Sequence, residues 1–413
     1  MQIKKNNIKS KLISSVHSVI VRKIENHIER DNWGFLIPEL PPGSILVGGY
    51  IRDLILNRSS LYPDVDIVVP TNSIEIGRNI AKQFSFKFLI LDPEREIIRI
   101  ISEKFILDIA NQTNDLLVED LKKRDLTINS IGYSFDSRQL IDPLNGTFDL
   151  QNSLLRCFDY SNIMNDPLRI LRCFRFVSEL NFTIEPNLLK FIELNKVQLR
   201  SVSVERIQYE LKKIVKGKEA LKAIIYLNQI RIFDWIQSYE RNSSLFLLSI
   251  NYEFLSNEEV KKYLPIVYLR ELLKSKVIKE FKFSKSDSHE INSLRRWTNK
   301  LKKKSIEAFT EIERFELHKE LEMILPAFIL YLPSDCQNYW LKRWRNKKDR
   351  LFHPRNFING NILKTKLGME DGPLLGNLLE YISMEFAYER LNNFDEAIYK
   401  AKQWFQQNAP KCD

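Results

Sequence analysis

The segment LVGGYIRDLILNRSSLYPDVDIVVP, residues 46–70, places two carboxylates inside an otherwise apolar stretch. Its last part, DVDIVVP, is typical of a β-strand and carries Asp64 and Asp66 at positions i and i+2. Because successive side chains of a strand point to opposite faces, both carboxylates are predicted to project from one face. Two like charges held this close repel each other and call for a partner of opposite charge. The opposite face then carries Val65, Ile67 and Val69.

A divalent cation is the partner that this pair predicts. Hard oxygen ligands suit Mg²⁺, which binds one or two carboxylates and completes its shell with phosphate oxygens and water. The alternative is an Asp-rich turn in which one aspartate caps and the other is solvated, and a DxD pair alone does not decide between them. Asp108, near the end of the strand-like run KFILDIA, is a candidate third catalytic carboxylate that would complete a two-metal site. Its alternative is a strand-end charge.

A glycine pair strengthens the phosphate interpretation. Gly48 and Gly49 follow the strand-like SILV and precede the helix-like YIRDLILNR. Backbone N–H groups at a helix start and the guanidinium of Arg52 on the first turn suit phosphate oxygens. The alternative is a tight turn followed by a surface arginine.

A second polar cluster lies in LKKRDLTINSIGY, where Arg124, Asp125 and Asn129 fall within about one turn if the segment is helical. Amid apolar neighbours, such a cluster is suited to grip a ribose hydroxyl and a triphosphate. The alternative is an ion pair on a helix surface.

The segment NDPLRILRCFRF starts a predicted helix, with Asp166 suited to the N-cap and Pro167 to the first helical position. Cytosine and adenine present an amine beside a ring nitrogen acceptor, whereas uracil and guanine present a carbonyl there. Asp166 paired with Arg169 is therefore suited to accept C and A and to reject U and G. The alternative is an intrahelical ion pair. Arginines recur every third residue along the helix, at Arg169, Arg172 and Arg175.

Composition indicates a globular protein. The 413 residues carry 63 Lys and Arg against 53 Asp and Glu, and a net charge of +10 suits a polyanion partner, although solubility alone would also account for it. No apolar run reaches about eighteen residues, so no transmembrane helix is expected. Four separated cysteines without CxxC spacing, and five histidines without ligand-pair spacing, favour neither a zinc site nor a disulfide framework and indicate a cytoplasmic location.

The basic, amphipathic start of the chain, residues 1–30, has two interpretations. It fits a transit peptide, but it lacks a long apolar region, and Glu25 and Glu29 close a pattern typical of an ordinary surface helix.

The chain is predicted to be α+β. Five β-rich runs, SILVGG, DVDIVVP, FKFLILD, EIIRIIS and KFILDIA, alternate with helix-like pieces, and helical periodicity dominates from about residue 151. No glycine occurs between Gly217 and Gly360, which fits helices with short connections. The expected organisation is an N-terminal helical segment at 1–34, a head with a small mixed sheet at 35–150, a helical neck at 151–215, and a helical body and tail at 216–413.

Taken in order, six segments closely resemble those of the class II tRNA nucleotidyltransferases and bacterial poly(A) polymerases. They are LVGGYIRDLILNR, DVD, LKKRDLTINSI, IDPLNGTFDLQNSLLRCF, NDPLRILRCFRFVSELNF and SVERIQYELKKIV, and they cover roughly residues 45–215. The resemblance implies a polymerase-β-like nucleotidyltransferase head followed by a helical neck, body and tail, with tRNA bound by the body and tail. It also implies transfer of CMP or AMP from CTP or ATP to the 3′ hydroxyl of tRNA, with release of pyrophosphate.

The resemblance carries over to single residues. It implies that Asp64 and Asp66 are the metal ligands and that Gly49, Arg52 and Arg124 contact triphosphate and sugar. It also implies that the nucleotide is selected by Asp166, Arg169, Arg172 and Arg175.

Two departures from the family pattern matter. Asn165 stands where the family usually has Glu, at a position that mostly supports its neighbours, so a modest effect is expected. Full CCA-adding members generally carry a flexible loop between the strands that match EIIRIIS and KFILDIA, and here little beyond Ser102, Glu103 and Lys104 joins them. This tilts the expectation toward addition of the two C residues alone.

The C-terminal half matches less. LRRWTNKLKKK, from Leu294, and LKRWRNKKDR, from Leu341, interleave tryptophan with basic residues and are suited to RNA phosphates and bases. The alternative is a solvated face with one tryptophan turned inward. Poly(A) addition and full CCA or A addition remain competing enzymatic functions. A silent RNA-binding module competes from another class, but it has no need for paired carboxylates.

Overall fold

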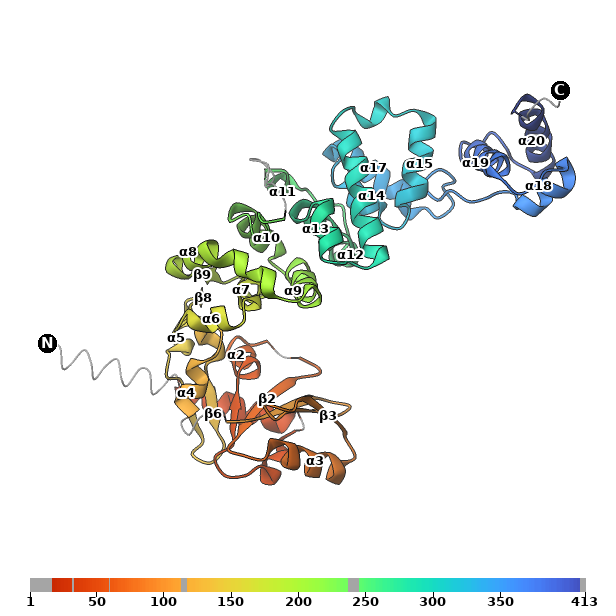
Figure 1. Cartoon of the computed structure of the whole chain (residues 1–413). Coiled ribbons are helices and arrows are strands. Elements are labelled where there is room, and N and C mark those ends of the chain that lie inside the picture. The colour runs from red at the N-terminus through yellow and green to blue at the C-terminus, as the bar shows by residue number, and fades with distance from the viewer. Residues whose placement is uncertain (1–16, 32, 59, 113–116, 237–244, 409–413) are drawn as a thin grey trace. The chain divides into compact units, whose positions relative to one another are not determined.

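The computed structural model describes residues 17–31, 33–58, 60–112, 117–236 and 245–408 (Figure 1). The chain divides into two compact units, one of residues 1–210 and 217–219 and the other of residues 211–216 and 220–413. The first unit contains the β-sheet, and the described part of the second is helical, which confirms the predicted α+β class.

The sheet of the first unit has seven strands in the order β3-β4-β5-β2-β1-β6-β7. β2 and β5 run parallel, and every other neighbouring pair is antiparallel. Each of the five apolar runs predicted as strands forms one. The bounds are β1 (Ile45–Val47), β2 (Asp64–Val69), β3 (Lys87–Asp92), β4 (Ile97–Ile101), β5 (Ile106–Asn111), β6 (Gly132–Ser134) and β7 (Gln139–Ile141).

One face of this sheet is covered by helix α3 (Ser73–Phe84), which packs on β3, β4 and β5. Gly77 makes this packing close, because a Cβ there would lie 2.5 Å from Cδ1 of Ile98. Ile98 and Ile100 of β4 are fully buried on this side. By alternation along the strands, the opposite face carries the polar residues of β2, β4 and β5.

A helix over residues 17–30 belongs to this unit. Its isoleucines at 20, 24 and 28 are buried, and Glu25 accepts a hydrogen bond from the hydroxyl of Tyr133 at 3.1 Å. The spacing of four residues puts the apolar side chains on one stripe. The described part of the N-terminal segment is thus an amphipathic helix packed on the sheet domain, while residues 1–16 of the predicted segment lie outside the described residues.

Helices complete the first unit. α2 follows β1 directly, and α7 is the longest helix between the sheet and α9. The elements are α2 (Gly49–Ile55), α4 (Leu117–Lys122), α5 (Gly146–Gln151), α6 (Ser161–Asn165), α7 (Leu168–Leu180), α8 (Pro186–Asn195) and α9 (Val204–Lys216), with the 3₁₀ helices η1 (Gly34–Glu39), η2 (Thr127–Asn129) and η3 (Lys196–Ser201) and the strand pair β8 (Leu154–Leu155) and β9 (Thr183–Ile184).

In the second unit, capping boxes begin α12 at Ser256 and α15 at Thr310. The last three helices bury a cluster of their own, which includes Leu378 and Ile382. The helices are α10 (Ala220–Gln229), α11 (Leu245–Ser249), α12 (Asn257–Leu272), α13 (Ser275–Glu280), α14 (Lys285–Leu301), η4 (Ile306–Ala308), α15 (Glu311–Leu321), α16 (Leu325–Ile329), α17 (Ser334–Arg345), α18 (Gly360–Leu367), α19 (Pro373–Ala387) and α20 (Phe394–Asn408).

The two tryptophans interleaved with basic residues are core residues. Trp297 is 1% exposed and donates to Glu320, and Trp344 is 9% exposed and donates to the carbonyl of Glu322. The prediction that these rings stack on RNA bases is therefore wrong, because helical periodicity turns both of them inward. The alternative of an inward tryptophan on an otherwise solvated face holds for both segments.

Candidate active site

Three charged residues form a row across the sheet face opposite α3. Asp66 of β2 is the parallel partner of Asp108 on β5, and Asp108 is the antiparallel partner of Arg99 on β4. Asp64 lies two residues before Asp66 on the same strand face. The topology thus brings Asp64, Asp66 and Asp108, called the carboxylate row below, onto one face, as the DxD spacing and the expected pairing of these strands predict.

Asp108 is held by Arg99. Nε of Arg99 donates to one carboxylate oxygen at 2.8 Å, and Nη2 donates to the other at 2.7 Å. Among the residues that the structure describes, no three or more His, Cys, Asp or Glu side chains are grouped so as to hold a metal ion. The expected cluster of three carboxylates is therefore not formed, because Arg99 occupies the third one.

Asp64 and Asp66 nevertheless fit a cation. Burial, and then the negative charges of Asp64 and Asp108, raise the pKa of Asp66 to about 6 against the opposing effect of Arg124. A carboxylate in this setting is incompletely compensated by the protein. A hard divalent ion between the two aspartates would supply the missing positive charge.

Gly48 brings a cation and a carboxylate together at the end of β1. Its φ of 80° favours glycine, and a Cβ there would lie 2.8 Å from Nη1 of Arg124 and 3.0 Å from Oδ2 of Asp66. Nε of Arg124 is buried without a hydrogen-bond partner among the described residues. Gly48 therefore allows Arg124 to approach the carboxylate row from the β1 side.

Arg52 is more constrained than predicted. Its Nε and Nη2 donate to the carboxylate of Asp53 at 3.0 and 2.9 Å, and its Nη1 donates to Asn129 at 2.8 Å. The pair of Arg52 N–H groups expected to bind phosphate is thus bonded to the carboxylate of the adjacent residue, Asp53. Gly49 lies against this guanidinium, since a Cβ there would be 3.4 Å from Nη2.

Asp125 connects this loop to α7. Asn129 donates to Oδ1 of Asp125 at 2.8 Å, and Nε of Arg172 donates to Oδ2 at 2.7 Å. Although burial disfavours its charged form, the Arg172 charge and these hydrogen bonds lower the pKa of Asp125 to about 2. Arg124, Asp125 and Asn129 are close as predicted, but they lie in a turn and in η2 rather than in one helix.

Three guanidiniums surround the ring of Phe176, a fully buried residue of α7. Arg52, Arg172 and Arg175 lie 4.9, 5.8 and 4.7 Å from its centroid. Arg175 also faces Glu210 at 3.4 Å, and its side chain is 11% exposed. Arg175 therefore forms a largely buried ion pair, and its role in nucleotide selection stays a prediction.

Asp166 and Arg169 are not bonded to each other through their side chains. Oδ2 of Asp166 accepts from Arg206 at 2.8 Å, whereas Nη1 of Arg169 donates to the backbone carbonyls of Lys123 and Asn162, each at 3.0 Å. The alternative of an intrahelical ion pair is thus wrong. Both side chains are fixed by other segments of the first unit, as base-reading groups need to be.

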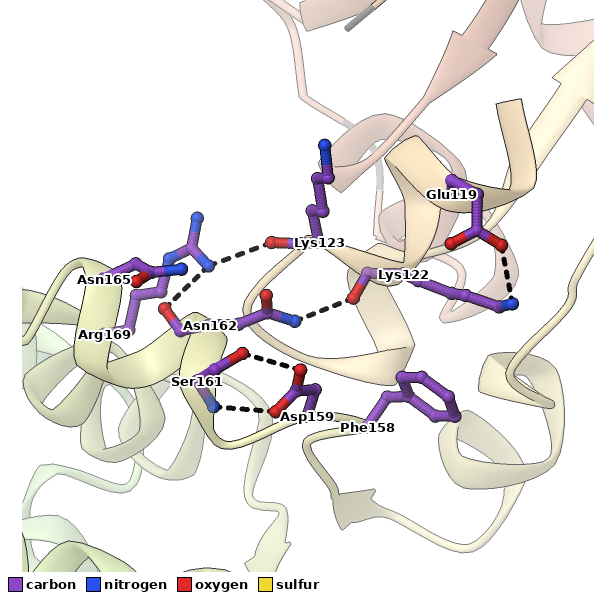
Figure 2. Close-up of a pocket in the computed structure, with 9 residues that line it drawn as sticks. All are labelled: Glu119, Lys122, Lys123, Phe158, Asp159, Ser161, Asn162, Asn165 and Arg169. Carbon is purple, nitrogen blue, oxygen red and sulfur yellow. Dashed lines mark hydrogen bonds and ion pairs between the residues drawn. The ribbon is translucent and has the colours of Figure 1, made fainter. Parts of the chain in front are cut away.

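A pocket of about 460 Å³ opens beside Arg169 (Figure 2). Lys122 and Glu119 are joined by an ion pair at 2.8 Å, and the ring of Phe158 is 57% exposed. The pocket is lined by Glu119, Lys122, Lys123, Phe158, Asp159, Ser161, Asn162, Asn165 and Arg169. The residues of the carboxylate row are not part of it.

Sequence reasoning missed Arg99, Phe176 and Arg206. The available signal for Arg99 is a single charged residue in the apolar run IIRII, residues 97–101. Phe176 resembles any apolar residue of an amphipathic helix, and Arg206 lies forty residues from its partner Asp166.

Comparisons with known proteins place the chain in a family. The model of the poly(A) polymerase head domain matches residues 44–156, and the model described as the probable RNA- and SrmB-binding site of polymerase A matches residues 181–239. The CC-adding tRNA nucleotidyltransferase of Synechocystis is 30% identical over 396 residues, covering 88% of this chain and 94% of that protein. The chain belongs to the class II CCA-adding enzyme family.

This family member is a nucleotidyltransferase. The CCA-adding enzyme of Streptococcus agalactiae is 26% identical over 85% of this chain and 90% of its own length. The solved structure of the Thermotoga maritima CCA-adding enzyme complexed with tRNA has a TM-score of 0.66 at 23% identity, covering 87% of this chain and 90% of that one. The predicted fold, a polymerase-β-like head followed by helical parts, is confirmed.

Proposed function

We propose that this protein adds CMP to the 3′ end of tRNA without a template and stops after two residues. The observation that carries the chemistry is the pair of carboxylates, Asp64 and Asp66, on one sheet face beside Arg124. Two observations favour CC addition. The relative that is 30% identical over nearly the whole chain is a CC-adding enzyme, and the connection between β4 and β5 is short.

The join between β4 and β5 is a closed turn over residues 102–105. The backbone N–H of Ser102 donates to the carbonyl of Phe105 at 3.0 Å, and Oγ of Ser102 accepts from the N–H groups of Lys104 and Phe105. Phe105 is 2% exposed and anchors the turn in the core. This join leaves no room for a long flexible loop between β4 and β5, which favours two-residue addition.

Asp64 and Asp66 would hold the metal, and hard oxygen donors favour Mg²⁺. The ion, when bound, would lower the pKa of the attacking hydroxyl and stabilise charge on the triphosphate. Arg124, on the β1 side, would face the triphosphate with Gly48 and Gly49. Arg52 and Asn129 would act through Asp53 and Asp125, as residues that hold this loop in position.

Base selection is assigned to Asp166, just before α7, and to Arg169 on the first turn of α7. Asp166 offers a carboxylate acceptor and Arg169 offers N–H donors, and separate partners hold each of them. Arg172 supports this pair through Asp125, and Arg175 stabilises α7 through Glu210. The helical residues 216–413 would bind the tRNA, which agrees with the net positive charge.

None of the helices in the described part of the chain combines the length and apolarity that crossing a bilayer requires. The thiols of Cys157, Cys173 and Cys336 are free, and Cys412 lies outside the described residues. Free thiols are typical of a reducing compartment, which supports our proposal that the enzyme works in the cytoplasm.

Three tRNA substrates test the proposal. They end at the discriminator base, at the first C, or at the second C, and each is incubated with labelled CTP or ATP and Mg²⁺. The expected result is addition of CMP that stops after two residues, with no AMP added to any end. AMP addition to the CC end would establish CCA or A addition instead, and long AMP tails would indicate a poly(A) polymerase. No incorporation would leave RNA binding without catalysis.

A further inference from the structure

Two arginines flank the carboxylate row, and the proposed function uses one of them. Arg124 lies on the β1 side against Gly48, near the α7 residues assigned to the base. Arg99 lies on the opposite side, on β4, beyond Asp108. The strand order β4-β5-β2-β1 fixes this arrangement.

The geometry of the reaction indicates on which side of the carboxylate row each reacting group lies. In nucleotidyl transfer the attacking and leaving oxygens lie roughly in line across the phosphorus. With the triphosphate at Arg124, pyrophosphate leaves toward β1. The 3′ hydroxyl must therefore approach from the Asp108 side, and the RNA strand that carries it passes over β4.

We propose that Arg99 binds the phosphodiester on the 5′ side of the RNA's 3′-terminal nucleotide while it holds Asp108 in place. This rests on the proposed function, because that function sets the direction of approach. A guanidinium has five N–H donors, of which Nε and Nη2 each give one to Asp108. Nη1 has no partner among the described residues, and the side chain is 32% exposed. One planar group thus bridges the carboxylate and the RNA backbone.

The sheet continues as a surface suited to a single strand. Leu89 on β3 is the register partner of Arg99 and is 49% exposed, so an aliphatic side chain lies next to the proposed phosphate site. Lys87 is two residues earlier on the same face and is exposed. A sugar or base of the RNA would lie over Leu89, and the next phosphate would lie at Lys87. The RNA strand would then continue across the sheet away from the carboxylate row.

Binding without nucleotide or turnover tests the contact. The probe is tRNA that lacks CCA, titrated at several salt concentrations against the wild type, Arg99→Gln and Arg95→Gln. Arg95 is a matched control, because it is 76% exposed in the turn of the same hairpin and makes a long ion pair with Asp92. We expect Arg99→Gln to weaken binding about tenfold and to reduce the slope of log Kd against log salt by about 0.7. Arg95→Gln should match the wild type, and CTP affinity should not change in either variant.

A modified RNA locates the phosphate. A neutral methylphosphonate at the last linkage of the tRNA should weaken its binding to the wild type by the same factor of about ten. The same modification should not weaken its binding to Arg99→Gln any further. An undiminished penalty in Arg99→Gln, or an unchanged salt slope, would overturn the proposal. Thermal unfolding checks that the variants fold. If Arg99→Gln does not fold, Arg99→Lys replaces it, because lysine keeps the charge but loses the forked pair of N–H donors. The methylphosphonate should then weaken binding to Arg99→Lys by a smaller factor than binding to the wild type. Since no catalysis is measured, a failure to add CMP would reject the proposed function without touching this result.

Discussion

Asp125 and Arg172 join the loop beside the carboxylate row to helix α7. Nε and Nη2 of Arg172 lie 2.7 and 2.6 Å from Oδ2 of Asp125, and Asp125 is 5% exposed. The other oxygen of Asp125 accepts from Asn129, whose own oxygen accepts from Arg52. Helix α7, which carries Arg169 and begins just after Asp166, is therefore fixed to the loop that follows Arg124.

Replacing Asp125 tests this link. Asp125→Asn would leave Arg172 without its carboxylate in a largely buried site, and we expect a loss of roughly 2–4 kcal/mol in the free energy of unfolding. Denaturant unfolding of the whole chain measures it. Glu193→Gln, on the exposed side of α8, is the control and should stay within about 0.5 kcal/mol of the wild type. A loss no larger than that control would show that α7 does not depend on this pair.

The paired aspartates should separate catalysis from folding. Asp66→Asn removes a proposed metal ligand, and we expect CMP incorporation to fall by at least about a thousandfold. It also removes a buried charge repelled by Asp64 and Asp108, so the melting temperature should stay equal or rise. Asp64→Asn should show the same loss of activity with unchanged tRNA binding. Substantial remaining incorporation in either variant would remove these residues from the metal site.

The strands of the head could be predicted because alternating apolar residues reveal them one at a time. DVDIVVP shows both its carboxylates and its buried face without any tertiary information. The partner of Asp108 could not be predicted in the same way, because Arg99 reaches it only through the register of β4 against β5. A shift of one residue would have turned Arg99 to the α3 side.

The same limit explains the errors around α7 and in the second unit. Asp166 and Arg169 are three residues apart, but each finds a partner in another segment, at Arg206 and at the Lys123 carbonyl. Trp297 is flanked by cations in sequence, yet its ring is buried and its N–H meets Glu320. Local spacing gives the possible pairs, and long-range packing chooses among them.

Arg169 should govern the choice of base. Arg169→Ala removes the N–H donors assigned to the nucleotide, and we expect discrimination between CTP and UTP to fall by about ten- to a hundredfold. Single-turnover rates with each nucleotide measure the ratio. Because Arg169 also binds two backbone carbonyls, a melting curve must accompany the assay. Full discrimination in a folded Arg169→Ala variant would contradict the assignment.

A buried histidine should make stability depend on pH. Burial, and then the charge of Arg343, lower the pKa of His318 to about 3, with smaller contributions in the same direction from His353 and Arg314 and an opposing one from Asp349. The unfolded chain binds this proton below pH 6.5 and the folded chain does not, so the contribution to stability is complete above pH 6.5 and declines as pH falls toward 3. The slope from this one group approaches about 1.4 kcal/mol per pH unit.

His318→Phe should flatten that slope. The ring lies against Phe352 and Trp340 at 4.1 and 5.1 Å, so an aromatic replacement keeps the packing. Its buried Nδ1 has no hydrogen-bond partner in the described part of the chain, so no bond is lost there. Denaturant unfolding at pH 7 and pH 5 measures the difference, and the exposed His289→Gln should keep the wild-type slope. Equal slopes in the wild type and His318→Phe would show that His318 does not set the acid limit.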